Sequence, residues 1–253
     1  MADIFSKLYI RSIRLADMPP QRDYVSTLPV VRHLAKMGEL RFSKPVTFLV
    51  GENGVGKSTL IEALAVAMGF NAEGGTKNFS FSTHSTHSGL WEHLSLVKSP
   101  LRARDGFFLR AESFYNVASN IDDLDGEGGL GAPVINSYGG ISLHEQSHGE
   151  SFLALVRNRF GGNGVYILDE PEAALSPMRL MTLLAEMNRL VQSNSQLIIA
   201  THSPILMTFP GAQILQIDQS GIRSVDYRQT EHYRTTRRFL ENPNSILSEL
   251  LDS

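Results

Sequence analysis

Cysteine is absent from the 253 residues of this chain. Disulfide bonds and thiolate metal sites are therefore excluded, and the composition suits a reducing compartment. Long apolar runs are missing too, because no stretch approaches the roughly 18 residues that a membrane-spanning helix needs. The segment Met1 to Lys7 lacks the basic stretch and apolar core of a secretory signal. We therefore expect a cytoplasmic protein that does not insert directly into a membrane.

A marked excess of charge of one sign is also missing. With 23 Lys and Arg against 26 Asp and Glu, the formal net charge is −3, so the composition gives no general attraction for nucleic acid. Basic residues gather locally in two places, which is more typical of solvated helix and strand faces than of a binding patch. These are Arg32, Lys36, Arg41 and Lys44, and Arg234, Arg237 and Arg238.

Short apolar runs alternate with helical patterns along the chain, which favours an α/β fold with a partly parallel sheet. Val46 to Val50 has only Thr47 as a polar interruption, as expected of a strand that is buried on both faces. The other predicted strands are 5–15, 39–42, 106–110, 165–168 and 197–200, with a hairpin over 213–227 that turns at 219–221. The predicted helices are 57–68, 149–159, 178–192, 231–240 and 245–251, with Pro243 separating the last two. The length fits a single domain over residues 1–253, with an inserted lobe over residues 71–150.

Two segments have the composition of irregular loops. Residues 71–88 are rich in Gly, Ser, Thr and Asn, and residues 122–131 are acidic and glycine-rich. We expect both to be mobile or to become ordered with a partner. The acidic segment lacks the ligand spacing of an EF-hand, so a calcium loop is not expected.

Residues Gly51 to Ser58 match the pattern G-x-x-x-x-G-K-[ST]. They follow the buried strand directly and precede a predicted helix, which is the context that a phosphate-binding loop requires. Glycines let the backbone turn its N–H groups towards phosphates, and the positive end of the helix dipole points at the same anion. We expect Lys57 to reach the β- and γ-phosphates of a nucleotide and the Ser58 hydroxyl to ligate Mg²⁺. The predicted nucleotide-binding residues of this loop are Asn53, Gly54, Val55, Gly56, Lys57, Ser58 and Thr59.

A second apolar strand, residues 165–168, is followed by Asp169 and Glu170. A parallel strand delivers the residues at its carboxyl end to the crevice where ligands bind in open α/β sheets. We expect Asp169 to hold the Mg²⁺ shell and Glu170 to orient and deprotonate the attacking water. The alternative is a strand that merely ends in solvated acids.

The third such strand, residues 197–200, is followed by Thr201 and His202. We expect His202 to hydrogen-bond the γ-phosphate and to report its presence, with Thr201 nearby. The alternative is a structural histidine before a helix that starts at Ser203 and Pro204.

The set of motifs resembles the ABC ATPase family, and within it the SMC-like and OLD-like ATPases rather than the transporter ATPases. Gly51 to Ser58 is similar to Walker A, the strand that ends at Asp169 is similar to Walker B, and Glu170 resembles the catalytic glutamate. His202 resembles the switch histidine. The sequence Asp169-Glu170-Pro171-Glu172-Ala173-Ala174-Leu175 is similar to the D-E-P-E-A-x-L run of the SMC and OLD branch, and residues 174–176 occupy the D-loop position. The motifs occur in the order of the family and cover most of the chain.

This resemblance implies an α/β P-loop NTPase fold, with an ABC-ATPase head-like mixed sheet, flanking helices and an N-terminal antiparallel β lobe. It implies ATP and Mg²⁺ as cofactors. The catalytic residues that it implies are Lys57, Glu170 and His202.

The sequence Ser147-His148-Gly149-Glu150-Ser151 resembles the ABC signature, although it departs from the common L-S-G-G-Q form. A Ser N-cap, a Gly that permits close approach and a fresh helix N-terminus would bind a γ-phosphate. We therefore predict that Ser147, Gly149 and Glu150 bind nucleotide. In the family this element serves the ATP of the other subunit, so the resemblance implies a head-to-tail homodimer with two ATPs at its interface. The alternative is a plain capped helix.

Transporter ATPases carry a Q-loop glutamine between Walker A and the signature. Here the one glutamine in that interval is Gln146, which adjoins the signature and comes too late. Glu112, just after the predicted strand 106–110, is the predicted substitute and would join Ser58 and Asp169 at the metal. The missing glutamine counts against coupling to a membrane permease. A long coiled coil between Walker A and the signature is absent too, so the nearest resemblance is to the compact, stand-alone ATPases of this branch.

We therefore expect an Mg²⁺-dependent ATPase whose ATP-dependent homodimer closes and reopens on a partner. The resemblance implies nucleic-acid maintenance or defence, with nucleic acid or a partner protein as the candidates. The main alternative is the ATPase subunit of an ABC transporter. A small-molecule kinase would use the same phosphate loop but would not need Ser147 to Ser151 or His202. A third alternative is an interaction module that binds ATP and barely hydrolyses it.

Overall fold

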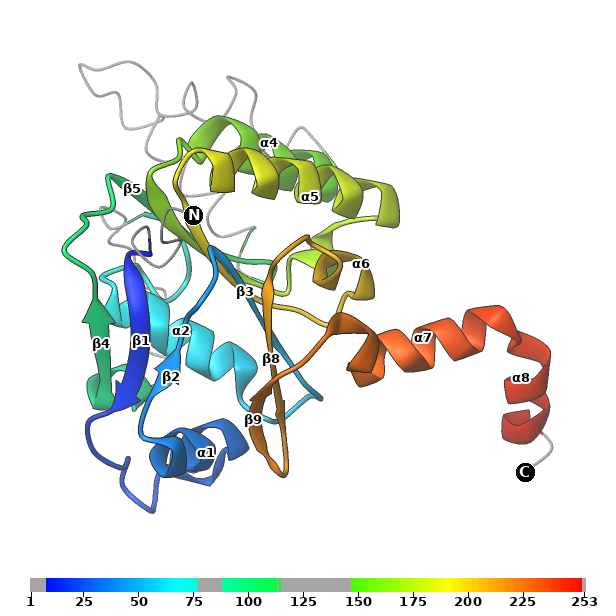
Figure 1. Ribbon diagram of the computed structural model, residues 1–253, viewed down its shortest axis with the longest axis horizontal. Helices are drawn as coiled ribbons and strands as arrows, with labels where there is room; N and C mark the ends of the chain where they lie inside the picture. Colours follow the sequence, from blue (N-terminus) through cyan, green and yellow to red (C-terminus); the bar gives the residue numbers. More distant parts are fainter. Residues whose placement is uncertain (1–7, 77–87, 113, 115–146, 252–253) are drawn as a thin grey trace.

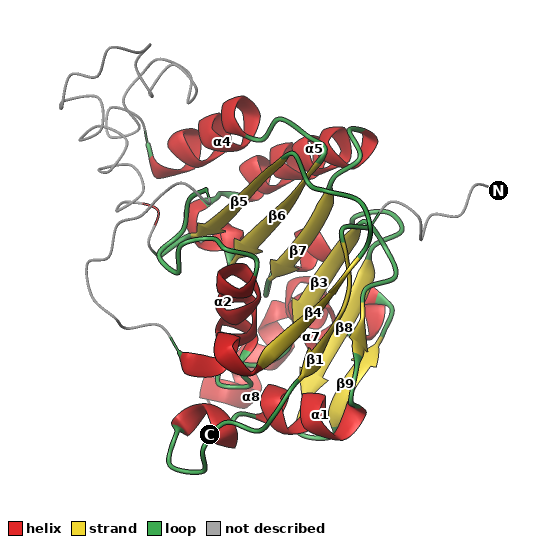
Figure 2. Ribbon diagram, turned by 90° about the vertical axis from the view of Figure 1, so that its left-hand side faces the viewer, coloured by secondary structure: helices red, strands yellow, loops and turns green. Residues whose placement is uncertain are grey.

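A computed structural model describes residues 8–76, 88–112, 114 and 147–251. Its largest element is a six-stranded sheet in the order β5-β6-β7-β3-β8-β9, in which the first five strands are parallel and β9 is antiparallel to β8 (Figures 1 and 2). These strands are β5 (Asp105–Arg110), β6 (Gly164–Asp169), β7 (Gln196–Ala200), β3 (Val46–Val50), β8 (Gln213–Asp218) and β9 (Gly221–Ser224). Every residue of β3, β6 and β7 is buried, because helices cover both faces of the sheet there. The uninterrupted apolar runs of the sequence are thereby explained.

A smaller antiparallel sheet lies beside the main one, in the order β2-β1-β4. Its strands are β1 (Ile10–Leu15), β2 (Leu40–Arg41) and β4 (Leu94–Lys98). The buried side chain of Gln196 joins the two sheets. Its Oε1 accepts hydrogen bonds of 2.9 Å from the N–H groups of Tyr9 and Ile10, and its Nε2 donates to the Ile10 carbonyl. A mixed sheet with an N-terminal antiparallel β lobe is the fold class that the sequence predicts, and it is confirmed.

The helices divide the core into two layers. On one face of the main sheet, α2 (Lys57–Ala67) packs between the two sheets, together with α1 (Pro29–Met37) (Figure 2). On the other face lie α4 (His148–Arg159), α5 (Pro177–Gln192) and the short α6 (Pro204–Met207). Short 3-10 helices occupy Tyr24–Thr27, Gly89–His93, Pro171–Ala174 and Tyr227–Gln229. Of these elements, α1 and β4 are not anticipated by the sequence patterns.

Two helices at the carboxyl end of the chain, α7 (Glu231–Glu241) and α8 (Pro243–Leu251), extend away from the sheets (Figure 1). Neither helix contains a buried residue. Pro243 is the first residue of α8 rather than part of a linker, since a proline at this position lacks only an N–H that would have no partner inside the helix. The first turn of α7, in contrast, lies beside the carboxyl edge of the main sheet.

The inserted lobe predicted over residues 71–150 stays a prediction, because most of it lies outside the described residues. The same holds for the acidic loop at 122–131 and for residues 77–87 of the other predicted loop. Within the described part of the chain, no helix has the length and apolar character needed to cross a membrane.

Candidate active site

At its two ends, the loop between β3 and α2 has a backbone conformation that only glycine adopts easily. Gly51 and Gly56 have φ angles of 153° and 95°. A Cβ atom on Gly51 would lie 2.2 Å from the carbonyl oxygen of Ile217 in β8, and one on Gly56 would lie 2.6 Å from the Val30 side chain in α1. Neighbouring elements thus press against the loop from both sides, which holds its backbone N–H groups in place at the N-terminus of α2.

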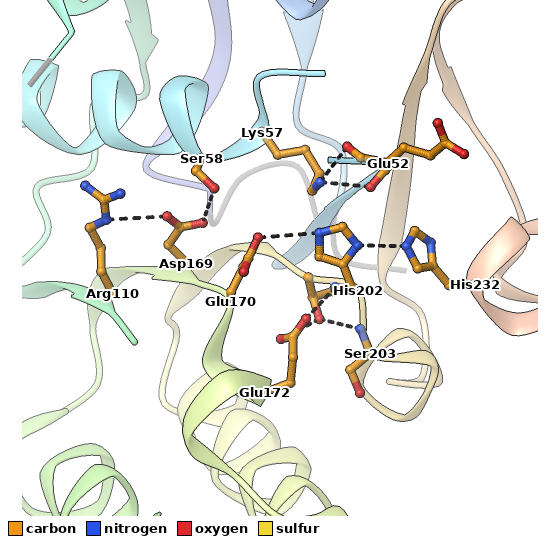
Figure 3. A network of polar contacts seen from close by, with 12 residues as sticks. Glu52, Lys57, Ser58, Arg110, Asp169, Glu170, Glu172, His202, Ser203 and His232 are labelled. Carbon is orange, nitrogen blue, oxygen red and sulfur yellow. Dashed lines mark hydrogen bonds and ion pairs between the residues drawn. The ribbon is translucent and has the colours of Figure 1, made fainter. Parts of the chain in front are cut away.

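Lys57, the first residue of α2, folds back over this loop. Its side chain is 4% exposed, and its Nζ donates to the carbonyl oxygens of Gly51 at 2.8 Å and Glu52 at 3.0 Å (Figure 3). Burial lowers the pKa of Lys57, and the nearby carboxylates of Glu170 and Asp169 oppose that shift. An ammonium group held at the mouth of a glycine loop can bind an anion such as a phosphate.

Ser58 and Asp169 meet across the gap between α2 and the end of β6. The Ser58 hydroxyl donates to Asp169 Oδ1 at 3.1 Å, and Asp169 is 5% exposed. Burial raises the pKa of Asp169 to about 6, although the Arg110 charge and the Ser58 hydrogen bond act in the opposite direction. A hydroxyl and a nearly buried carboxylate with incomplete charge compensation fit a hard divalent cation such as Mg²⁺.

Arg110 is a member of this group that the sequence interpretation missed. It ends β5 and lies directly opposite Asp169 in the parallel register of β5 and β6. Its Nε lies 3.5 Å from Asp169 Oδ2, and its Nη1 donates to Glu62 of α2 at 2.8 Å. The signal that could have revealed it is a basic residue at the end of an otherwise apolar strand.

Glu170 follows β6 in a left-handed backbone conformation, with φ of 48°. Its N–H donates to the carbonyl oxygen of Ala200 in β7 at 3.0 Å, so the chain turns sharply there. The turn brings Glu170 Oε1 within 3.4 Å of His202 Nε2 (Figure 3). A carboxylate and an imidazole beside a phosphate loop can activate a water molecule and hydrogen-bond a phosphate oxygen.

Glu172 lies beneath this pair and was given no role by the sequence interpretation. Its carboxylate accepts a hydrogen bond of 2.8 Å from the Thr201 hydroxyl and another from the His202 N–H. Burial raises the pKa of Glu172, and these hydrogen bonds oppose that shift. The side chain therefore fixes the backbone that carries His202.

The signature-like sequence opens α4 on the opposite face of the sheet from α2 (Figure 2). Ser147 and Glu150 form a capping box, in which the Ser147 N–H donates to Glu150 Oε2 at 3.2 Å and the Ser147 side chain accepts from the backbone of Glu150. The Ser147 hydroxyl also donates to Glu150 Oε2 at 2.5 Å. Arg179 of α5 binds both residues, with its Nη1 donating to Ser147 Oγ at 3.1 Å and its Nη2 lying 3.0 Å from Glu150 Oε1. A Cβ atom on Gly149 would lie 2.5 Å from Arg179 Nη1 and 3.0 Å from the Ala174 carbonyl oxygen. The close approach at Gly149 is therefore to Arg179 and Ala174 of the same chain.

The structure thus brings Lys57, Ser58, Asp169, Glu170 and His202 together at one edge of the sheet. The loop residues Asn53, Gly54, Val55, Gly56 and Thr59 lie with them, between β3 and the first turn of α2. The structure does not bring Ser147, Gly149 and Glu150 to this group, because they open α4 on the other face of the sheet.

Glu112 also stays outside the group. Its side chain is 86% exposed, and its contact with Arg110 is 3.8 Å long. The reason is that β5 ends at Arg110, which occupies the position opposite Asp169, while Glu112 follows in a turn. Among the described residues, no group of three or more acidic or histidine side chains is arranged to hold a metal ion.

A cavity of about 480 Å³ adjoins the start of the phosphate loop. It lies between the loop, the β8–β9 hairpin and the first turn of α7, and Glu52, Asp218, Arg223, Thr230 and His232 are among the residues that line it. The edge of the sheet that carries the phosphate loop is thus open on the side of the hairpin.

The strand–loop–helix with Lys57, and the acids at the end of the parallel strand β6, have the arrangement of a P-loop site in a mixed α/β sheet. Two family models match separate parts of the chain. One is described as an AAA domain and covers residues 32–107. The other is an AAA domain whose description names the AbiEii toxin of a type IV TA system, and it covers residues 137–208.

Among curated proteins, the chain is similar to DNA repair protein RAD50 of Drosophila melanogaster, with 40% identity over 68 residues. That match covers 26% of this chain and 5% of the RAD50 protein, so most of that protein has no counterpart here. Among solved structures, a metal-chelate type ABC transporter in an inward-facing conformation aligns with a TM-score of 0.50 at 14% identity, over 90% of this chain and 88% of that chain. The structure of cbiO1 from Clostridium perfringens, part of the ABC transporter complex cbiONQ, aligns with a TM-score of 0.54 at 17% identity, over 97% and 100% of the two chains.

At such identities the solved structures establish the fold alone. The AAA-domain matches, the RAD50 similarity and the fold together support an SMC/ABC-like ATPase, and ATP binding is the activity that they support.

Proposed function

We propose that the chain is an Mg²⁺-dependent ATPase whose two copies close around ATP and reopen after hydrolysis. The observation that carries the proposal is the meeting of five side chains at the carboxyl edge of the main sheet. Lys57 folds over the phosphate loop, Ser58 binds Asp169, and the Glu170 and His202 side chains lie 3.4 Å apart. They provide an anion-binding cation, hard oxygen ligands and a base, which are the groups that phosphoryl transfer to water requires.

Each of these residues has a role in the proposed reaction. The loop N–H groups and Lys57 bind the β- and γ-phosphates, and Ser58 and Asp169 would hold Mg²⁺, which neutralises phosphate charge when bound. Glu170 takes a proton from water while the water oxygen bonds to the γ-phosphorus. The bond from that phosphorus to its bridging oxygen breaks, and ADP and phosphate leave. His202 donates a hydrogen bond to the γ-phosphate.

The dimer part of the proposal rests on the position of the signature-like sequence. Ser147 and Glu150 cap α4 away from the phosphate loop of their own chain, and Arg179 holds them there. A second copy in a head-to-tail arrangement would present this helix N-terminus to the γ-phosphate. The site would then be complete only when two chains and two ATP molecules assemble.

The test is the light-scattering mass of the Glu170→Gln protein with and without Mg-ATP, because the amide keeps the shape of the side chain and cannot act as a base. We expect this variant to bind ATP, to lose turnover and to double in mass with Mg-ATP. Adding Ser147→Arg in the same background should abolish the doubling and leave ATP binding intact. An unchanged hydrolysis rate in Glu170→Gln would refute the role of Glu170, and a monomer with bound ATP would refute the dimer.

For the partner class we propose nucleic acid, and the names of two of the matches support this proposal. The RAD50 relative is named for DNA repair, and the description of the second family model names the AbiEii toxin of a type IV TA system. ATP-dependent binding of duplex DNA by the Glu170→Gln protein, absent without Mg-ATP, is the expected result. The fold likeness to transporter ATPases supports a subunit of an ABC transporter as the second candidate. Co-purification with a membrane permease, in place of DNA binding, would favour it.

A further inference from the structure

His232 lies at the edge of the candidate active site, although it is distant from the other site residues in the sequence. It belongs to the first turn of α7, which Thr230 caps, and it is partly buried. Its Nε2 lies 2.7 Å from Nδ1 of His202, and the two rings meet edge-on with centroids 4.8 Å apart and planes at 66° (Figure 3). Two imidazole nitrogens at this distance share one hydrogen in an N–H···N hydrogen bond.

The surroundings decide which ring donates that hydrogen. Burial and the Lys57 charge lower the pKa of both histidines, which favours the neutral form of both rings. His232 lowers the pKa of His202 further, and Glu170 opposes the shift. A neutral imidazole carries one N–H and one bare nitrogen. His202 Nε2 faces the Glu170 carboxylate at 3.4 Å, where a bare nitrogen would oppose an acceptor. This contact favours a hydrogen on His202 Nε2 but is too long to fix it, and the hydrogen bond from the Nε2–H of His232 to a bare Nδ1 adds the stronger preference.

We propose that His232 is a positioning residue that fixes the tautomer and direction of His202, so that the Nε2–H of His202 points towards Glu170 and the γ-phosphate of ATP. The inference rests on the proposed function, since it gives His202 a γ-phosphate to contact. Glu172 already holds the backbone of His202, and the hydrogen bond with His232 restricts the rotation of the imidazole ring. His202 Nε2 is buried and, among the described residues, has no hydrogen-bond partner of good geometry. It is thus a donor ready for an incoming oxygen atom.

The contact between His232 and His202 also attaches the first turn of α7 to the main sheet. Apart from Thr230 and its first turn, α7 has little contact with the core. The pair of histidines therefore joins the projecting helices to the nucleotide edge. A displacement of α7 would release the ring of His202 from its fixed direction.

The first test is the imidazole ¹⁵N spectrum of the labelled, ATP-free protein at neutral pH, with His202→Gln and His232→Gln used for assignment. We expect His202 to be protonated on Nε2 alone, and to become a mixture of tautomers in His232→Phe, which keeps an aromatic ring and removes the donor. A wild-type His202 protonated on Nδ1, or a tautomer that His232→Phe leaves unchanged, would overturn the inference. This measurement needs no hydrolysis, so it separates a failure of this inference from a failure of the proposed ATPase function.

The second test is steady-state ATP hydrolysis. His232→Phe should lower kcat by roughly 3- to 10-fold, the value of one hydrogen bond, with little change in KM. His232→Gln should restore most of the rate, because its amide N–H reaches the position of the imidazole Nε2–H. Arg238→Ala, on the exposed part of α7, is the control for general disturbance of the helix and should leave kcat unchanged. Equal losses in the Phe and Gln variants would indicate a merely structural role and refute the positioning role.

Discussion

The buried carboxylate of Asp169 leads to an unusual prediction, which is that removing its charge stabilises the protein in the absence of nucleotide. Its pKa is about 6 in the folded chain, against 3.8 for a free aspartate, because burial disfavours its ionised form more than Arg110 and Ser58 favour it. An acid with a raised pKa binds its proton more tightly in the folded state. Ionisation therefore costs stability, beginning above the unfolded pKa and complete above the folded pKa.

The size of the effect follows from the shift. A difference of about two pKa units corresponds to about 3 kcal/mol at full ionisation, taken as an upper limit. Asp169→Asn has the shape of the neutral acid and no titration. The variant should therefore exceed the wild type in unfolding free energy by up to about 3 kcal/mol near pH 7.5 and by about half of that near pH 5. Below the unfolded pKa of aspartate, the two proteins should be equally stable in this respect.

Urea unfolding in EDTA without nucleotide, at several pH values between 5 and 8, measures this difference directly. Asp105→Asn is a matched control with the opposite sign. Burial raises the pKa of Asp105, but hydrogen bonds from Tyr166, Gly161 and Arg159 outweigh it and lower the pKa overall. Asp105→Asn should therefore lose stability, and this loss should stay nearly constant between pH 5 and 8, because it shrinks only below the unfolded pKa of aspartate. The reasoning is refuted if Asp169→Asn is less stable than the wild type at pH 7.5, or if its advantage does not grow with pH.

Three further predictions concern the phosphate loop and the residues beneath it. Lys57→Ala should weaken ATP binding by roughly 10- to 100-fold in calorimetry, since it removes a charge-assisted hydrogen bond to phosphate, and an affinity like that of the wild type would refute this role. Gly51→Ala should cost roughly 1–3 kcal/mol in urea unfolding, because its Cβ would meet a backbone oxygen at 2.2 Å. Gly54→Ala, which has open space around its Cβ, should cost only about 1 kcal/mol from its left-handed backbone, and equal costs would contradict the steric argument. Glu172→Gln should lower kcat without changing the KM for ATP. The NH₂ group of the new amide is a donor, so it cannot accept the hydrogen bonds that Thr201 and the His202 N–H donate to Glu172. A change in KM alone would count against this role.

The local parts of the site could be predicted from the sequence because each is encoded by neighbouring residues. The phosphate loop could be predicted from the fixed spacing of its glycines, lysine and serine. The strands β3 and β6 could be predicted from their uninterrupted apolar runs. Parallel strands bring their carboxyl ends to one edge, so the neighbourhood of Asp169, Glu170 and His202 followed from the strand assignments alone. The bounds of α2, α4, α5 and α7 differ from the predicted ones by one residue or less at every end.

The residues that complete the site could not be found in this way. Arg110 lies beside Asp169 through the register of β5 against β6, and Glu172 reaches the backbone of His202 across a turn. The choice of Glu112 as a metal residue rested on the order of motifs, and strand register puts Arg110 in that place. These contacts join segments whose separation and relative orientation in space cannot be read from the sequence.

The sequence by itself determined the α/β fold class, the phosphate loop and the acids at the strand ends, because local spacing and burial on both faces leave a direct pattern in the chain. Only the tertiary structure decided that Arg179 holds Ser147 and Glu150, and that the first turn of α7 brings His232 to His202. The physical reason is that hydrogen bonds act over a few ångströms, while the partners lie 29 to 32 residues apart in the chain. Which partners meet depends on how the packed layers orient their helices, and that orientation is a property of the whole core.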